Sequence, residues 1–212
     1  MLVRVTHAID YRFEQRVELA NLELRLSPRS EQAGVRHHQV LIEPVPAELR
    51  EACDAFDNVV LRANVGAATA ALSISALTTL GLGGTPSAPD VEAELSGLLL
   101  DRASERARRK LAGLCREQSE KAALAATARG LACRFVSGYF LGQEGSSDLH
   151  MWIAVQMNDR WIEWDPTHAR LADTHLALAR GPNVEDVAPV GGSLVAVGRY
   201  RMLSRVTVER LP

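Results

Sequence analysis

Three side chains suited to nucleophilic catalysis follow one another along the chain: Cys115, His150 and Asp165. A thiol, an imidazole and a carboxylate are the parts of a triad in which the base takes the thiol proton and the acid orients the base. The chemistry of such a group is acyl transfer, in which a thiolate attacks a carbonyl carbon, a thioester forms, and water or an amine resolves it. Whether the three residues can meet depends on the elements that carry them.

The run that begins at Cys115 predicts a helix. Residues 115–129 include five alanines, which favour helix, and Gly130 follows, as glycine often does just past a helix end. We therefore expect Cys115 in the first turn, where unpaired backbone N–H groups and the positive end of the helix dipole favour a thiolate. The small alanine side chains would let this helix lie close against a sheet.

Two strand-like runs and the short segment between them predict a hairpin. Residues 149–157 and 160–165 are rich in β-branched and aromatic side chains, which favour strands. Asn158 and Asp159, between the two runs, tolerate the positive φ that a tight hairpin loop requires. We expect an antiparallel pair whose loop consists of these two residues alone.

The register of this hairpin decides whether the base and the acid meet. A two-residue loop pairs Met157 with Arg160 and brings Trp152 opposite Asp165. Because side chains alternate across a strand, His150 and Asp165 then become diagonal neighbours on one face, with Cβ atoms roughly 7 Å apart or less. The other face carries an apolar set suited to burial: Met151, Ile153, Val155, Ile162 and Trp164. A three-residue loop would break this register.

Each of the three residues has a simpler interpretation when it is taken alone. An isolated cysteine is most often an inert small hydrophobe. A strand histidine is most often structural, and an aspartate before a proline is usually a turn former. The combination on one calculated face, with a cysteine at a helix start, favours the catalytic interpretation.

Other aromatic and histidine side chains are weaker candidates. Trp152 and Trp161 could each form a wall of the cleft, although tryptophans are more often core residues. Trp152 shares the calculated face with His150, so we predict that it is the one that binds substrate. His168 and His175 follow the hairpin and could line the cleft, but the sequence gives neither of them a role. His7, on the first strand-like run, is expected to be structural.

Metal and cofactor sites are not predicted. His37 and His38 are adjacent on a strand, so their side chains point to opposite faces and cannot easily share an ion. Three widely spaced cysteines form neither a zinc motif nor a disulfide framework. Cys133 lies among apolar residues and is expected to be inert.

Composition points to a globular protein without nucleic-acid or membrane partners. Of 212 residues, 47% are hydrophobic and 24% are charged, which is typical of globular proteins. The formal net charge of −2 does not favour binding to nucleic acid or to an anionic membrane. No apolar run is long enough to span a bilayer, and the first residues indicate a strand, not a signal peptide. We expect a cytoplasmic location, where thiols stay reduced. The sequence leaves the oligomeric state open.

The pattern along the chain predicts an α+β protein. Residues 1–84 alternate apolar and polar positions in short runs and predict an N-terminal antiparallel β-sandwich-like domain. Residues 85–112 predict a linker and a helical passage, and residues 113–212 a catalytic core in which one central helix packs on an antiparallel sheet. The last strand-like runs, 194–197 and 206–209, are expected to be further strands of this core.

Motifs along most of the chain resemble a known family, the bacterial transglutaminase-like superfamily of papain-related cysteine enzymes. The core motifs are Gly113-Leu114-Cys115, Cys133-Arg134-Phe135-Val136-Ser137-Gly138-Tyr139, His150-Met151-Trp152, Trp161 and Asp165-Pro166-Thr167. The N-terminal half resembles the β-domain that precedes the core in one bacterial subgroup, through His7, Leu26-Ser27-Pro28-Arg29 and Asp54-Ala55-Phe56-Asp57-Asn58.

The resemblance implies roles for the three residues. Cys115 would be the nucleophile, His150 the general base and then acid, and Asp165 the group that orients the imidazole. The substrate would be a peptide or protein bearing an amide. Transfer to water would make the protein a peptidase or amidase, and transfer to a primary amine would make it a transglutaminase.

An alternative interpretation is a catalytically impaired pseudoenzyme that serves as a protein-binding module. The passage before Cys115 is shorter than is usual in the family, so the core is expected to be a shortened one. This passage commonly supplies the second donor of an oxyanion hole, and the sequence identifies no such donor here.

Overall fold

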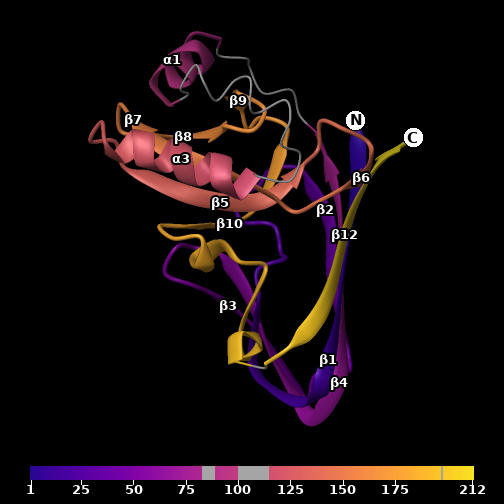
Figure 1. Cartoon of the computed structure of the whole chain (residues 1–212). Coiled ribbons are helices and arrows are strands. Elements are labelled where there is room, and N and C mark those ends of the chain that lie inside the picture. The colour runs from indigo at the N-terminus through magenta and orange to yellow at the C-terminus, as the bar shows by residue number, and fades with distance from the viewer. Residues whose placement is uncertain (83–88, 100–114, 197) are drawn as a thin grey trace.

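The computed structural model describes residues 1–82, 89–99, 115–196 and 198–212, which fold into two antiparallel sheets with helices beside the second one (Figure 1). The α+β class predicted from the sequence is confirmed. Within the described ranges, no helix is both long enough and apolar enough to cross a bilayer.

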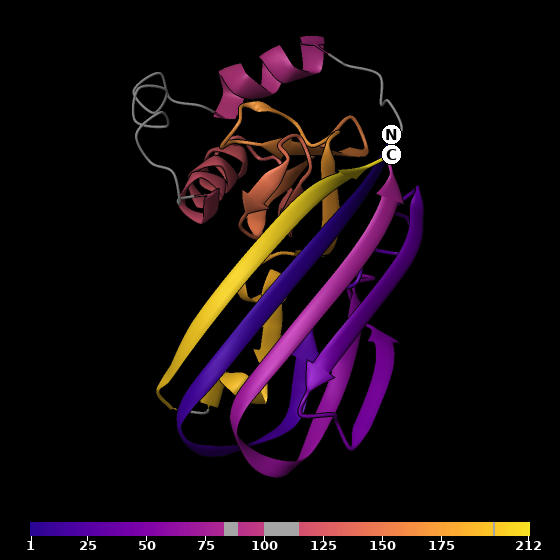
Figure 2. The same cartoon turned by 90° about the vertical axis from the view of Figure 1, so that its right-hand side faces the viewer.

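The first sheet is built on two long strands of the N-terminal half. Its order is β2 (Val35–Glu43), β4 (Val59–Gly81), β1 (Leu2–Leu24), β12 (Tyr200–Leu211) and β6 (Gly145–Ser147), with β3 (Glu48–Cys53) added to β4 and β11 (Val190–Gly192) added to β1. Strands β1 and β4 are each 23 residues long, and their register shifts at bulges between Arg12 and Leu22. Both strands curve back at their far end, which gives the sheet two layers (Figure 2).

Alternating side chains explain why β1 forms one of the central strands. Every second residue from Val3 to Phe13 is buried, and these positions pack into a large apolar core. Alternation with period two is what a sheet with a single buried face requires. The antiparallel N-terminal sheet was therefore predictable from this pattern.

The C-terminal strand contradicts one prediction. Strand β12 pairs with β1 along its whole length, with Val208 opposite Val5, so residues 206–209 belong to the first sheet and do not extend the catalytic core. Its Val206 and Val208 side chains are buried in the core of that sheet, which explains the choice of partner. The other predicted run was 194–197: its residues 194–196 lie in a short 3-10 helix, η2 (Ser193–Ala196), and residue 197 lies outside the described residues.

The second sheet carries the hairpin predicted from the sequence. Its order is β10 (His175–Gly181), β5 (Cys133–Phe140), β7 (His150–Met157), β8 (Arg160–Asp165) and β9 (Arg170–Leu171). Helix α3 (Cys115–Thr127) packs on one face of it, and helix α1 (Pro89–Leu99) packs on α3. The shared core holds Leu95, Leu99, Ala122, Ala126, Ile153, Val155 and Trp164. The buried alanines allow the close approach of helix and sheet that their size predicted.

The two sheets share a core. Tyr139, Leu176 and Leu178 come from the second sheet, yet they pack into the apolar core of the first. Strand β6 follows β5 along the chain and pairs with β12. A short helix, η1 (Glu185–Val187), leads from β10 back toward the first sheet. The second sheet therefore rests on the N-terminal sheet, which holds it in place.

Candidate active site

Cys115 lies where the sequence predicted it, at the first residue of helix α3. The helix ends at Thr127, and Gly130 follows with φ of 74°, while the Leu131 N–H donates to the Ala126 carbonyl at 3.1 Å. Ser119, one turn after the cysteine, donates its hydroxyl to the Met151 carbonyl at 3.0 Å. This bond ties the first turn of α3 to the start of β7.

The surroundings of Cys115 favour its thiolate. Burial raises the pKa of the thiol, but hydrogen bonding to His150, the charge of that imidazole, and the backbone N–H groups of Met151 and Arg116 outweigh burial. The net result is a thiol pKa below its ordinary value. An imidazolium and helix N-terminal amides are the features that activate cysteine nucleophiles.

The hairpin has the predicted register. Met157 pairs with Arg160, and the loop residues Asn158 and Asp159 have φ of 48° and 61°, as a two-residue turn of this hand requires. His150 and Asp165 therefore share a face, and the Nε2 of His150 lies 2.8 Å from the Oδ2 of Asp165. The spatial prediction made from the spacing of these residues is confirmed.

His150 is held as a cation between an acid and a thiol. Burial lowers the pKa of the imidazole, but hydrogen bonds to Asp165 and Cys115 and the charges of both groups raise it to about 9. Because Nε2 donates to Asp165, the nitrogen that remains for the thiol is Nδ1. The arrangement supports a thiolate–imidazolium pair near neutral pH.

Asp165 accepts more hydrogen bonds than the hairpin alone predicts. Its Oδ2 lies 2.8 Å from Nε2 of His150, 2.5 Å from Nδ1 of His168 and 2.9 Å from Nε2 of His175. Its Oδ1 accepts the backbone N–H groups of Thr167 and His168 at 2.8 and 3.2 Å. Burial raises the pKa of this carboxyl, but the three imidazoles outweigh burial and hold it far below its usual range.

Sequence reasoning gave no role to His168 and His175, although both contact the acid. His168 follows Asp165 by three residues in the turn after β8, and a turn of this length brings the side chains together. That short spacing was a usable signal. His175 begins β10, which pairs with β5 and not with the hairpin, so its approach to Asp165 depends on sheet order.

Trp152 lies on the predicted face but does not form a cleft wall among the described residues. Its side chain is fully buried, and its Nε1 donates to the Oε2 of Glu163 at 2.8 Å. The indole stacks beneath His150, with ring centroids 5.9 Å apart. The large side chain fills the interior of the second sheet. Whether Trp152 also contacts substrate stays a prediction.

The imidazoles and the carboxylate are also ligand types that a transition metal binds. The ligand atoms of His150, Asp165, His168 and His175 lie within 4.8 Å of one another. The three hydrogen bonds to Asp165 account for this convergence without an ion. The absence of a metal stays a prediction.

The remaining cysteines and histidines have structural surroundings. Burial raises the pKa of Cys133 to about 11, which fits the expected inert thiol. His7 is fully buried and joined to the hydroxyls of Tyr139 and Ser204, at 3.0 and 2.9 Å. His37 is exposed, whereas its neighbour His38 is joined to hydroxyls of Ser27 and Thr78. The pair does not share a ligand site.

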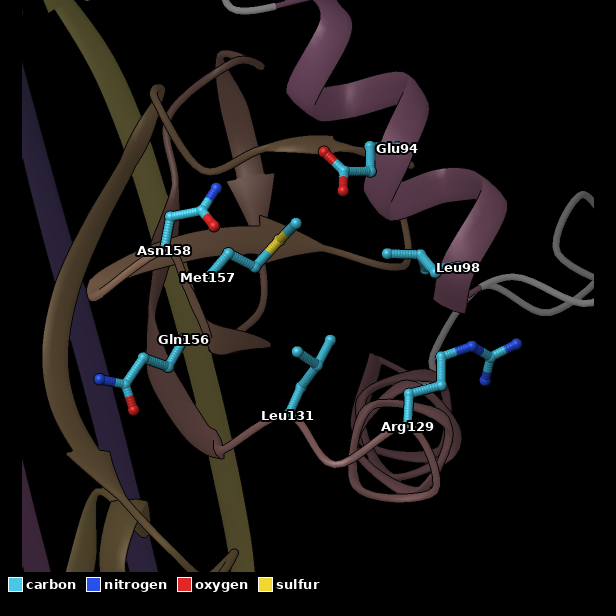
Figure 3. A pocket seen from close by; sticks show the side chains of 7 residues that line it. All are labelled: Glu94, Leu98, Arg129, Leu131, Gln156, Met157 and Asn158. Atoms are coloured by element: carbon cyan, nitrogen blue, oxygen red, sulfur yellow. The ribbon is translucent and has the colours of Figure 1, made fainter.

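A pocket of about 410 Å³ lies at the other end of β7, away from the triad (Figure 3). Its lining combines apolar and polar side chains from α1, the segment that follows α3, and the hairpin: Glu94, Leu98, Arg129, Leu131, Gln156, Met157 and Asn158. Cys115, His150 and Asp165 are not part of this lining. Residues 100–114 lie outside the described part of the chain. They include the motif glycine Gly113 and part of the passage in which the sequence identified no second oxyanion donor.

Family models and one solved structure are similar to this chain. Residues 3–80 match the model of the bacterial transglutaminase-like N-terminal region, and residues 99–166 match that of the transglutaminase-like superfamily. A crystal structure named a "putative cysteine protease" from Cytophaga hutchinsonii is similar over 100% of this chain and 91% of its own, with a TM-score of 0.68 and 13% identity. At that identity the likeness shows a shared fold. No curated protein sequence matches.

Proposed function

We propose that this chain, which belongs to the transglutaminase-like superfamily, is a thiol-dependent enzyme that transfers the acyl group of an amide. One observation carries the proposal: the Nε2 of His150 lies 2.8 Å from the Oδ2 of Asp165, and the same imidazole is the group that lowers the pKa of the Cys115 thiol. A cysteine, a base and an orienting acid in one connected line are what the reaction requires.

In the proposed reaction each of the three groups has a part. The Cys115 thiolate attacks the amide carbonyl carbon, and His150 gives its Nδ1 proton to the leaving nitrogen as the C–N bond breaks. The product of this half-reaction is a thioester and a free amine. His150, now neutral, takes a proton from an incoming water or amine, which attacks the thioester and releases the thiol. Asp165 keeps the ring oriented and stabilises its cationic form.

Peptides and proteins are the proposed substrates, with water as the principal acceptor. The proposal of hydrolysis is supported by the name of the Cytophaga protein, whose fold this chain shares. A primary amine in place of water would make the same thioester a source of cross-links. The choice between them depends on which nucleophile reaches the acyl group first.

Labelling with an electrophilic thiol probe tests the proposal. We expect iodoacetamide to modify Cys115 rapidly at pH 6–7, with the site mapped by mass spectrometry, because its thiolate is stabilised there. His150→Ala should slow the reaction about a hundredfold, whereas Cys53→Ser, at an exposed free cysteine, should leave it unchanged. A Cys115 that reacts no faster than Cys53 would contradict the proposal.

Turnover then separates the two acceptors. Casein and a glutamine-containing peptide are incubated with the protein, with and without a fluorescent primary amine. New peptide termini, or ammonia released when no amine is added, indicate hydrolysis, and fluorescence retained on the peptide indicates amine transfer. Either activity should disappear in Cys115→Ser. Activity that survives this substitution would exclude the thiol mechanism.

A further inference from the structure

The acid of the triad is shared by three imidazoles, and the proposed reaction uses only one of them. The nitrogen atoms of His150, His168 and His175 lie 2.5–2.9 Å from a single oxygen of Asp165. Since the carboxylate can only accept, each imidazole must donate an N–H to it. His168 and His175 therefore donate to Asp165 although the proposed reaction does not require either of them.

We propose that His168 and His175 are positioning residues that hold the Asp165 carboxylate in the orientation that His150 requires. This inference rests on the proposed function, because it deepens the account of the same site. A carboxylate on a short side chain can rotate about its terminal bond. Two further donors on Oδ2, and two backbone N–H groups on Oδ1, leave it one orientation.

His175 holds the acid from the interior of the protein. Its side chain is fully buried, and it donates through Nε2 to Asp165. Its Nδ1 has no hydrogen-bond partner among the described residues. Burying an imidazole with one unpaired nitrogen costs stability. The hydrogen bond to Asp165 is the contact that explains a histidine at this position.

His168 holds the acid from the solvent side and uses the other ring nitrogen. Its side chain is 38% exposed, and it donates through Nδ1. The ring stacks on Phe140 with centroids 4.4 Å apart and planes 19° from parallel. The stacking fixes the ring plane, so that the N–H points at the carboxylate.

The use of different nitrogens allows a crossed test. The amide nitrogen of asparagine occupies roughly the position of Nδ1, and that of glutamine roughly the position of Nε2. At position 168, asparagine should therefore keep the bond and glutamine lose it. At position 175, glutamine should keep the bond and asparagine lose it. His37→Asn, at an exposed histidine of β2, is the matched control.

Two readouts are measured on the full chain, in buffer with EDTA so that metal binding to the imidazoles does not enter. The first is the titration of His150 by NMR of its side-chain nitrogens. The second is the rate at which iodoacetamide modifies Cys115 at pH 7. The charged groups that face His150 are Cys115 from α3, Asp165 from β8, and His168 and His175 beside that acid.

We expect His168→Gln and His175→Asn to lower the pKa of His150 by about one unit and to slow alkylation about tenfold. His168→Asn and His175→Gln should restore both values to within about twofold of the wild type. Urea unfolding of each variant separates these effects from a loss of stability. If a variant at the buried position 175 does not fold, the pair at position 168 decides the question.

Several outcomes would overturn the inference. Equal effects of asparagine and glutamine at position 168, or a His150 pKa that rises when the donor is lost, would show that the two histidines do not position the acid. A wild-type Cys115 that reacts like a free thiol, with the crossed pattern still seen in the His150 titration, would refute the proposed function and leave this inference intact. Rapid alkylation of Cys115 in all four variants would refute this inference and leave the proposed function intact.

Discussion

Two buried histidines, one on each sheet, have the same side chain and opposite charge states. His7 of β1 is joined to the hydroxyls of Tyr139 and Ser204, and burial lowers its pKa to about 4. His150 of β7 is buried almost as fully, but its partners are the Asp165 carboxylate and the Cys115 thiol, and its pKa is raised to about 9. Burial alone makes a histidine neutral, and an adjacent carboxylate reverses this.

The difference between the two sites shows that the partners of a buried histidine, more than its burial, set its pKa. The N-terminal sheet uses a buried imidazole as a neutral link between strands. The second sheet places the same group beside an acid, where the proposed reaction needs a base. The following predictions test this contrast, from the largest expected effect to the smallest.

Removing the charge of Asp165 should have the largest effect. Asp165→Asn keeps the shape of the side chain but offers an amide to imidazoles that need an acceptor. We expect alkylation of Cys115 at pH 7 to fall by on the order of a thousandfold, because the imidazolium loses its partner. The rate is measured with iodoacetamide. Asp173→Asn, a nearby carboxylate paired with Arg170, is the control and should change the rate less than about threefold.

His7 should make stability fall in weak acid. Its folded-state pKa of about 4 lies below the ordinary value of 6.5, so the unfolded state binds more protons between these pH values. Its contribution is therefore fully present above pH 6.5 and is lost as the pH falls toward 4, by about 3 kcal/mol.

Urea unfolding of the wild type and of His7→Gln at pH 4.5, 5.5 and 6.5 measures this contribution. Burial lowers the pKa of His38 and His175 as well, and both add slopes of the same sign. The difference between the two proteins isolates His7, and it should shrink as the pH falls. Parallel curves for the two proteins would show that His7 binds a proton equally well in both states.

Cys115 of α3 and Cys133 of β5 should differ in reactivity, because their pKa values are shifted in opposite directions. Burial raises the pKa of Cys133 to about 11, whereas the pKa of Cys115 is lowered. At pH 7 we expect Cys133 to react at least about a hundredfold more slowly than Cys115, since thiolate is the reactive form. Peptide mapping after timed alkylation gives both rates in one sample. Comparable rates would remove the contrast.

The smallest effect should follow loss of the indole N–H beneath His150. Trp152→Phe removes the donor to Glu163, which keeps its contacts to Arg180. We expect a loss of about 1 kcal/mol in the free energy of unfolding, and alkylation of Cys115 slowed less than about threefold. Trp161→Phe, at a partly exposed indole of β8, should change neither measurement. A large rate effect from Trp152→Phe would make the indole part of the catalytic support.

Local patterns determined more of the site than of the fold. The hairpin register followed from Asn158 and Asp159, because a two-residue loop allows one pairing. The position of Cys115 at a helix start followed from the alanines and Gly130. The placement of residues 206–209 in the core was wrong, because a strand pattern shows which face is buried but not which sheet the strand joins.

By itself, the sequence determined the contact between His150 and Asp165 and the presence of a helix that begins at Cys115, since both depend on spacings of a few residues. Only the tertiary structure decided that β12 returns to β1, that Trp152 turns inward to Glu163, and that His175 reaches Asp165. The physical reason is that these contacts join segments whose order in a sheet is set by packing of the whole core. The alternation of apolar and polar residues along one strand does not show which strands will pair with it.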